Sequence, residues 1–434
     1  MGDFNQIIDE LRSTFALFPD RRTGSNTQYS MQDAGLAAFS VFFMQSPSFL
    51  SAQRAMQENK GRSNAGTLFK IDRIPTDNHV RNLLDPVEPK ALFPVYDRIY
   101  TVLRSQGVLN GFRSAGGTQL IALDGTWYHS SSNIHCKNCL TRRHKDGSIT
   151  YHHSAITPVI VAPGRKQAIA LRPEFIVPQD GAEKQDCEIS AAKRWLEGSG
   201  AFYNTGNDTL LGDDLYSHQP FCRMALLHNY HFIFVCKPDS HKYIYSWVDG
   251  LELGVDLHTQ TRRVKNKGKG ETHTFRYANR VPLAEGQDAL FVNWIEWTVQ
   301  VGGKETYRNT FVTDHEITEA NAFGIAEAGR ARWKIENENN NTLKTKGYHL
   351  EHNFGHGKQH LSSLLASMNI LAFLMHTLLD FTDNACQLVR NRLVKRKTFF
   401  EHVRALTCYH CFEGWGELMD FMMRGLEIGP YDTG

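Results

Sequence analysis

From residue 329 to residue 338 the chain reads Gly329-Arg330-Ala331-Arg332-Trp333-Lys334-Ile335-Glu336-Asn337-Glu338, and a polar stretch continues to Lys344. This composition predicts a helix, on which Arg332 and Glu336 are four positions apart and project from one face. Taken alone, such a pair is usually an exposed ion pair that contributes little to stability. Two upstream stretches, each ending in an aspartate, give Glu336 candidate partners and change that interpretation.

Short apolar strands are expected to carry both aspartates. Residues 119–126 contain an apolar run that ends at Asp124, and residues 209–215 contain a second run that ends at Asp213 and Asp214. Further elements are expected in the same region, namely strands at 148–161, 167–176 and 231–236 and helices at 187–197 and 221–227. The first three strands would form an antiparallel meander. The order β-β-β-α-β-α-β predicts an α/β fold, a mixed sheet flanked by helices.

The rest of the chain divides into regions of different character. These are a helical N-terminal domain expected to recognise DNA (1–117), a catalytic core in two parts (118–237 and 316–380), a β-rich insertion (238–315) and a helical C-terminal region (381–434). Composition alone is also compatible with a generic helical domain at 1–117. Alternating strands are expected in the insertion at 272–281, 290–299 and 306–313, after a basic loop at 262–269. Segment 361–381 is apolar over about one membrane thickness, but its polar residues favour a buried core helix.

Length, charge and cysteine content narrow the classes of protein. A chain of 434 residues is long enough for several domains and a sizeable core. A formal net charge of +2 excludes a global positive field, so any nucleic-acid surface must come from local basic clusters. Eight scattered cysteines, with no secretory signal at the N-terminus, lead us to expect a reducing cytoplasm.

Asp124, Asp213 and Glu336 can converge in such a fold. If the first and fourth strands are neighbours, their aspartates leave one edge of the sheet, and the later helix brings the glutamate over that edge. Converging carboxylates repel one another, and the usual remedy is a hard divalent cation, Mg²⁺ or Mn²⁺. Two such ions about 3.5–4 Å apart act on the attacking and leaving oxygens of a phosphodiester. We therefore expect a two-metal site for nucleic-acid backbone chemistry.

At these three places the chain resembles the DDE transposases of bacterial insertion sequences, which have a ribonuclease H-like catalytic core. The matching pieces are Ile121-Ala122-Leu123-Asp124-Gly125-Thr126, Leu210-Leu211-Gly212-Asp213-Asp214-Leu215-Tyr216, and Arg330-Ala331-Arg332-Trp333-Lys334-Ile335-Glu336-Asn337, which continues to Asn341-Thr342-Leu343-Lys344. It looks like the subgroup with a β-rich insertion before the catalytic glutamate. Two positions depart from that subgroup. Gly329 stands where a tyrosine is often found, and Lys344 follows Glu336 by eight positions rather than seven. On a regular helix the extra residue turns Lys344 about 80–100° away from Glu336.

The resemblance implies a cut-and-paste DNA transposase. It would nick transposon ends hydrolytically, using Mg²⁺ or Mn²⁺, and transfer the released 3′-hydroxyl to target DNA. Asp124, Asp213 and Glu336 would be the catalytic metal ligands, with Arg332 and Lys344 on DNA phosphates. The partners would be double-stranded DNA of the terminal inverted repeats and the target, bound by a homodimer in the bacterial cytoplasm, nucleoid-associated and away from the membrane. Two alternatives remain open, a ribonuclease H-like nuclease without strand transfer and a non-catalytic DNA-binding protein derived from a transposase.

Other residues are candidates for DNA contacts. Trp294 and Trp297 lie in the insertion, where related enzymes can place an aromatic ring against an unstacked base, but each can instead be a core residue of the insertion sheet. The basic runs 262–269 and 390–397 are candidate phosphate contacts or solvated faces.

A separate set of cysteines and histidines has the chemistry of a zinc site. Cys136 and Cys139 form a Cys-x-x-Cys pair, and His153, with His135 and His152 as further candidates, could complete a structural Zn²⁺ site. The alternative is free thiols. Two other groups are weaker candidates for metal binding, namely the pair Cys408 and Cys411 and the histidines His349, His352, His356 and His360.

Overall fold

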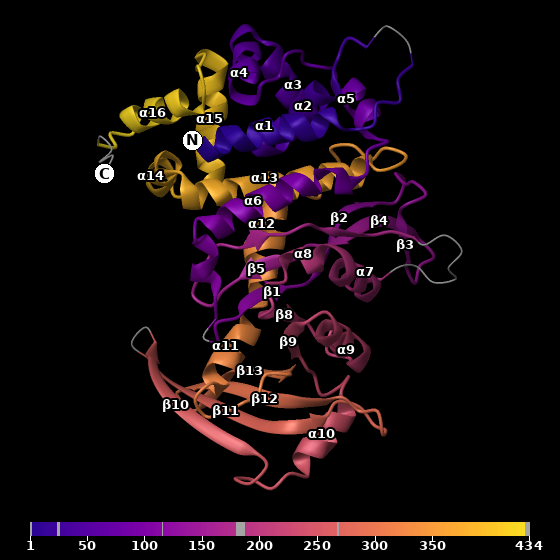
Figure 1. Cartoon of the computed structure of the whole chain (residues 1–434), viewed down its shortest axis with the longest axis vertical. Helices are drawn as coiled ribbons and strands as arrows, with labels where there is room; N and C mark the ends of the chain where they lie inside the picture. The colour runs from indigo at the N-terminus through magenta and orange to yellow at the C-terminus, as the bar shows by residue number, and fades with distance from the viewer. Residues whose placement is uncertain (1, 24–26, 115, 179–186, 267–268, 430–434) are drawn as a thin grey trace.

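The computed structural model describes residues 2–23, 27–114, 116–178, 187–266 and 269–429. Residues 267–268, near the end of the basic run 262–269, lie outside this part of the chain. The fold is a mixed α/β arrangement, with a long sheet below and a layer of helices above (Figure 1).

A central sheet runs through the lower two thirds of the molecule. Within the described residues it has nine strands, in the order β10 (His258–Asn266), β11 (Lys269–Pro282), β12 (Phe291–Val301), β13 (Lys304–Thr313), β9 (Tyr230–Val235), β8 (Asp208–Gly212), β1 (Gln119–Ala122), β5 (Val159–Val161) and β6 (Ile169–Ala170). β1, β8 and β9 are parallel, and the other neighbouring strands are antiparallel. The strands expected at 119–126, 209–215 and 231–236 are therefore confirmed in position.

The expected meander is only partly correct. The strand predicted at 148–161 divides into β4 (Ile149–Ile156) and β5, and the strand predicted at 167–176 divides into β6 and β7 (Glu174–Ile176). β1, β5 and β6 form the antiparallel part of the central sheet, whereas β4 joins β2 (Gly125–Ser131), β3 (Leu140–Arg143) and β7 in a second, small sheet. The division falls at Thr157-Pro158, where proline cannot donate to a strand ladder.

The β-rich insertion extends the central sheet. α10 (Lys242–Asp249) precedes four strands, β10 to β13, and β13 pairs with β9 through Phe311 and Val235. The three strands expected in the insertion are confirmed within β11, β12 and β13. The basic loop expected at 262–269 is wrong, because Arg262 and Arg263 lie in β10, which pairs with β11 from His258 to Asn266. β10 contains the β-branched residues Thr259, Thr261 and Val264, which favour a strand, and the positive charges did not prevent it.

The N-terminal and C-terminal helices form one layer. The N-terminal part contains α1 (Gly2–Ala16), α2 (Met31–Phe43), α3 (Phe49–Gln57), α4 (Asn59–Phe69), α5 (Asp77–Leu84), η1 (Pro89–Leu92), α6 (Phe93–Ser105) and η2 (Val108–Phe112). The C-terminal part contains α14 (Asn384–Leu393), α15 (Arg396–Tyr409) and α16 (Trp415–Gly425). The Trp415 indole donates to the Leu68 carbonyl at 2.8 Å and its ring packs against Phe4, so the two ends of the chain share a core (Figure 1).

A long apolar helix lies between this layer and the sheet. α13 (Leu361–Thr382) has the length and hydropathy of a membrane span, but 89% of its apolar window is buried inside the molecule. It packs against α2 and α6 on one side and β6 on the other. The expected core helix is confirmed, and packing accounts for its apolar composition.

Candidate functional site

The two aspartates leave neighbouring strands at the same level. β1 and β8 are parallel, with Ala122 opposite Leu211, and the ladder continues as Leu123 donates to the Leu211 carbonyl at 2.8 Å. Asp124 lies two residues after Ala122, and Asp213 lies two residues after Leu211. The predicted adjacency of the two strands is therefore confirmed, and both carboxyl groups lie at the carboxyl edge of the parallel strands.

Asp213 and its neighbour Asp214 have different surroundings. The Asp214 carboxylate accepts from the Lys237 backbone amide and from the Ser240 hydroxyl, both at 2.6 Å, so it holds the loop after β9. Asp213 accepts from the Leu215 backbone amide at 2.8 Å, and its charge acts on Asp124. This arrangement favours Asp213 as the partner of Asp124, as expected from the sequence.

A fourth carboxylate, Glu188, lies beside Asp124. It comes from the first turn of α7 (Glu188–Trp195), and its Oε1 accepts from the Gly125 backbone amide at 3.1 Å and from the Tyr216 hydroxyl at 2.6 Å. A Cβ on Gly125 would lie 2.5 Å from Glu188 Oε2, so a larger residue at position 125 would force the Glu188 side chain to shift. Sequence reasoning missed Glu188, because its helix position gave no sign that it would reach the strand.

Burial and neighbouring charge together perturb Asp124. Desolvation is the largest effect, followed by repulsion from Glu188, and they raise the pKa of Asp124 to about 7. Glu336 and Asp213 act in the same direction, whereas Arg332 opposes them. Burial likewise raises the pKa of Glu188 above its ordinary value. Asp124 and Glu188 therefore resist ionisation, and a bound cation would favour their charged forms.

Glu336 is held by the predicted ion pair. Arg332 contacts Glu336 at 2.8 Å, and the glutamate side chain is 52% exposed. Among the described residues, the sets of three or more potential ligands that lie within 4.8 Å of one another do not include Asp124, Asp213 and Glu336. The three carboxylates would therefore have to come closer together to share one cation.

The helix that carries Glu336 is irregular. The single helix expected from 329 to 344 consists of the end of α11 (Ala322–Arg330), a π-helical segment η4 (Ile335–Asn340) and α12 (Asn341–Thr345). Each π-turn holds about one residue more than an α-turn, because its hydrogen bonds span five residues instead of four. The extra residue between Glu336 and Lys344 is thereby absorbed, so the angular offset expected for a regular helix is wrong. The Lys344 ammonium group pairs with Glu351 at 2.8 Å.

Packing explains why residue 329 is a glycine. A Cβ on Gly329 would lie 2.8 Å from the Phe311 ring and 2.9 Å from Ile233 Cγ2. α11 therefore crosses β9 and β13 too closely for any larger side chain at this position.

The side chain of Asn340 links the helix to the strand edge. Its amide nitrogen donates to Asp124 Oδ2 at 3.0 Å, and its oxygen accepts from the Thr157 hydroxyl at 2.7 Å. Sequence reasoning missed this residue because it lies in a run of asparagines, Asn339-Asn340-Asn341, that resembles a solvated surface.

The tryptophans expected to contact DNA are core residues. Trp294 and Trp297 are 1% and 2% exposed, so neither ring is available to stack on a base, and that expectation is corrected in favour of the core alternative. Trp297 instead packs against Phe275 and Tyr307 in the insertion sheet. Trp333, next to Arg332, is 40% exposed.

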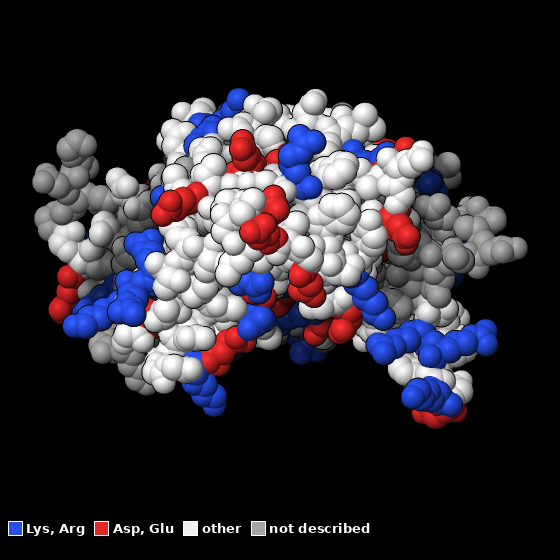
Figure 2. All heavy atoms as spheres, turned by 90° about the horizontal axis from the view of Figure 1, so that it is seen from below, with Lys and Arg blue, Asp and Glu red and all other residues white. Residues whose placement is uncertain are grey.

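Charges of both signs mix on the face of the molecule that Figure 2 shows. The view from the insertion end shows Lys and Arg side chains interspersed with Asp and Glu, with no broad face of one sign (Figure 2). This pattern agrees with the net charge of +2 and restricts phosphate contacts to local groups.

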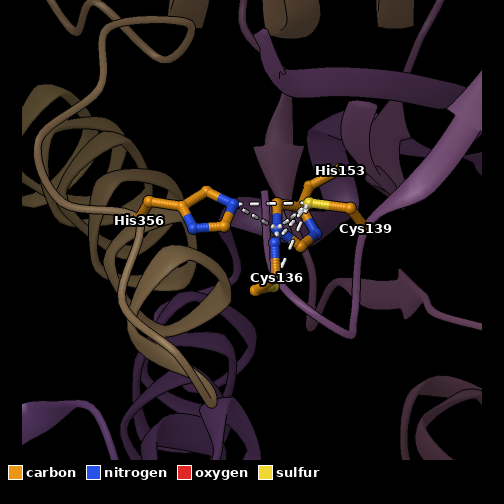
Figure 3. A group of neighbouring side chains, drawn as sticks. All are labelled: Cys136, Cys139, His153 and His356. Atoms are coloured by element: carbon orange, nitrogen blue, oxygen red, sulfur yellow. Dashed lines mark hydrogen bonds between the residues drawn. The ribbon is translucent and has the colours of Figure 1, made fainter. Parts of the chain in front are cut away.

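A second constellation lies in the small sheet. Cys136, Cys139, His153 and His356 place one potential ligand atom each within 4.8 Å of the others (Figure 3). The first three are the residues expected from the sequence, whereas His135 and His152 stack on Tyr151 and Trp127. His356 comes from the loop between α12 and α13.

A third group, His231, Asp314 and His315, also meets the distance criterion for metal binding. The Asp314 carboxylate contacts His231 at 2.6 Å and accepts from the Phe232 backbone amide at 2.8 Å. His315 lies 3.0 Å from the Thr209 hydroxyl. Hydrogen bonds within the protein account for this group.

Comparisons of the sequence with protein-family models and with curated proteins find no match. The interpretation of the site therefore depends on its residues and geometry.

Proposed function

We propose that this protein is a metal-dependent DNA transposase of the DDE type with a ribonuclease H-like core. The observation that carries the proposal is that Asp124 and Asp213 follow equivalent positions of the parallel neighbouring strands β1 and β8, and so lie at the same edge of the sheet. The order of the sheet supports it, because three antiparallel strands, β1, β5 and β6, are followed by two strands parallel to β1. The sequence around Glu336 supports the same family.

The residues present fit a hard divalent cation. Asp124 has a pKa raised to about 7 by burial and by the neighbouring acids, so a cation would relieve a repulsion that the protein otherwise retains. Asp124, Asp213 and Glu336 would hold two Mg²⁺ or Mn²⁺ ions, whose charge stabilises the attacking and leaving oxygens of a phosphodiester. Glu188 adds negative charge beside Asp124 and fixes the backbone at Gly125.

Other side chains would act on the DNA and on the ligands. Arg332 is 19% exposed and would contact a phosphate once Glu336 turns to the cations. Lys344 is a second phosphate candidate on the same helical segment. Asn340 orients Asp124 through the hydrogen bond to Oδ2. Water would attack first, and the 3′-hydroxyl that it releases would attack target DNA in line.

The proposed partner is double-stranded DNA, as transposon ends and as target. Synapsis of two ends predicts at least a homodimer on DNA. The basic side chains of β10, Arg262 and Arg263, and those of α14, Arg390 and Arg392, are candidate phosphate contacts. Arg390 already contacts Asp380 at 3.4 Å, so Arg392 is the freer group in α14.

The thiol–imidazole group of Cys136, Cys139, His153 and His356 is a second metal site in this proposal. Its sulfur donors suit zinc and not magnesium.

A nicking assay tests the proposal. The substrate is a supercoiled plasmid that carries the inverted repeats flanking this gene, incubated with Mg²⁺ or Mn²⁺. We expect nicks at the repeat ends with the native protein and loss of nicking in Asp124→Asn and Asp213→Asn. Glu338→Gln, an acid close to Glu336 on the same segment, is the control and should nick normally. Metal-dependent nicking that persists in Asp124→Asn would refute the assignment.

The alternatives give different results in the same system. A nuclease without strand transfer would nick the ends but never join a pre-cleaved end to target DNA. A non-catalytic DNA-binding protein would bind the repeats and leave them intact at every metal concentration.

A further inference from the structure

Four soft or borderline donors converge on one point from distant parts of the chain. Cys136 and Cys139 lie on the turn before β3, His153 lies on β4, and His356 lies on the loop after α12, 203 positions beyond His153 (Figure 3). Cys139 and His153 are buried, at 7% and 3% exposure. The side chains point toward one another from two sides, His356 from one and the other three from the small sheet (Figure 3).

The distances between donor atoms match the edges of a tetrahedron around zinc. The two sulfurs are 4.0 Å apart, three of the four sulfur-to-nitrogen distances are 3.6, 3.4 and 3.4 Å, and the two Nε2 atoms are 3.1 Å apart. Zinc bond lengths and tetrahedral angles require about 3.8 Å between sulfurs, about 3.6 Å between sulfur and nitrogen and about 3.3 Å between nitrogens. A disulfide would instead bring the sulfurs to about 2.05 Å.

The surroundings orient the donors as metal ligands require. His356 Nδ1 lies 3.1 Å from the Gly357 carbonyl, so Nδ1 carries the proton and Nε2 is free to bind. Backbone amides of Asn138 and Cys136 donate to the Cys136 and Cys139 sulfurs at 3.4 Å each, which stabilises thiolates. Residue types S₂N₂ in tetrahedral geometry select zinc among common metals.

We propose that Cys136, Cys139, His153 and His356 bind one structural Zn²⁺ ion that fastens the loop after α12 to the small sheet. Binding displaces the thiol protons of both cysteines, and no redox step is involved. The proposal does not depend on the proposed DNA chemistry, because it requires only these four side chains.

The location gives the ion a structural consequence for the carboxylates. β2 begins at Gly125, directly after Asp124, and pairs with β4, where His129 faces His153. The loop with His356 follows the segment that carries Glu336. The ion thus ties the chain after Asp124 to the chain after Glu336, and holds the two sides of the carboxylate site in register.

A second anchor secures the other end of the same loop. Asp85, at the end of α5, accepts from the backbone amides of Lys358, Gln359 and Leu361 at 3.0–3.2 Å. The Asn138 side chain donates to the Gln359 carbonyl at 2.6 Å. Residues 358–361 are therefore held by Asp85 of the helical layer and by Asn138 of the turn that carries the two cysteines, whereas the ion would hold His356.

Metal analysis of the full-length protein tests the proposal. The protein is purified under reducing conditions without chelator, and its zinc is measured by mass spectrometry. We expect one zinc per chain. His356→Asn should weaken zinc affinity by at least about 100-fold, because losing a ligand costs more than losing an outer-shell partner. Cys139→Ser should act likewise.

Matched variants control for the residue types. His135→Asn changes an exposed histidine next to Cys136, and Cys408→Ser changes an exposed cysteine in the second Cys-x-x-Cys pair. Both should retain one zinc per chain. If zinc is lost in Cys408→Ser and kept in Cys139→Ser, the assigned site is wrong. A native protein that neither contains zinc nor retains added zinc after desalting would also overturn it.

A measurement on the native protein tests the proposal even if the variants fail to fold. After removal of zinc by a chelator, Co²⁺ is added and the visible spectrum is recorded. Tetrahedral S₂N₂ coordination predicts intense ligand-field bands with a thiolate charge-transfer band. Trypsin should also cut faster after Lys346, which precedes His356 in the loop after α12, in the zinc-free protein. An octahedral cobalt spectrum, or identical trypsin sensitivity with and without zinc, would contradict the proposal.

Discussion

The Asn340 amide donates to Asp124 Oδ2 at 3.0 Å and so joins two residues that are 216 positions apart. Asn340 is the last residue of the π-helical segment, and its oxygen also accepts from the Thr157 hydroxyl. This contact fixes one oxygen of the partly buried aspartate. The irregular helix and the strand edge are thus connected through one polar side chain.

Replacing Asn340 with alanine should reduce Mg²⁺-dependent DNA nicking more than it reduces the stability of the fold. Asp124 would lose its orienting donor, so we expect DNA nicking to fall about 10- to 100-fold, as for other outer-shell partners. The midpoint of the Mg²⁺ dependence should rise. Asn337→Ala, which removes an exposed amide on the same segment, is the control. An unchanged Mg²⁺ midpoint in Asn340→Ala would show that the contact does not position Asp124.

The stability of the metal-free protein should depend on Asp124 and pH. Its folded pKa of about 7 lies above the ordinary value of 3.8, so the folded state binds more protons, and stability falls as pH rises from about 4 to about 7. Asp124→Asn removes this penalty and should raise the free energy of unfolding at pH 7 by at most about 4 kcal/mol.

The gain in Asp124→Asn should vanish below about pH 4, where the native carboxyl is protonated in both states. Thermal unfolding with a chelator present, from pH 4 to 8, measures it. Added Mg²⁺ should stabilise the native protein and not the variant. Equal stability of both proteins at pH 7 would contradict the raised pKa.

Gly329 should tolerate no side chain. In Gly329→Ala the new methyl group would meet Phe311 and Ile233 at less than 3 Å, and overpacking of this kind costs about 1–3 kcal/mol. Gly416→Ala in α16 meets open space and should be neutral or stabilising by about 0.5–1 kcal/mol. Urea unfolding compares the two. Equal effects would show that α11 does not pack closely against β9 and β13 at Gly329.

Trp333 and Trp297 should have opposite roles. Trp333 is exposed next to Arg332, and in Trp333→Ala we expect DNA-end affinity to fall by about 1–3 kcal/mol, the range for one stacked base, with unfolding unchanged. Trp297→Ala should destabilise the fold by about 3–5 kcal/mol, because its ring is buried. Fluorescence anisotropy of labelled DNA and thermal unfolding separate these effects. Normal DNA affinity in Trp333→Ala would show that Trp333 does not contact DNA.

The sequence was sufficient for features that depend on short-range patterns. Apolar runs located β1, β8 and β9, and the strand order that follows from them placed Asp124 beside Asp213. Alternation located the insertion strands, and an apolar run located α13. Each of these patterns reflects burial of one element against its neighbours.

Features that depend on long-range packing could not be derived. His356, Glu188 and Asn340 reach their partners only after distant segments meet, and no local spacing encodes this. Pairing of β13 with β9, which fuses the insertion to the central sheet, is likewise a tertiary result. The π-helical segment accommodates the eight-residue spacing between Glu336 and Lys344. A sequence does not show where a helix takes an extra residue, so this segment could not be predicted.

Strand transfer is the measurement that tests the central claim most directly. Pre-cleaved transposon ends with free 3′-hydroxyls, target plasmid and Mg²⁺ are incubated with the native protein, Glu336→Gln and Glu338→Gln, and joined products are separated on a gel. The account predicts joined products with the native protein and Glu338→Gln and none with Glu336→Gln. Undiminished joining by Glu336→Gln, or a native protein that binds the ends and never joins them, would contradict it.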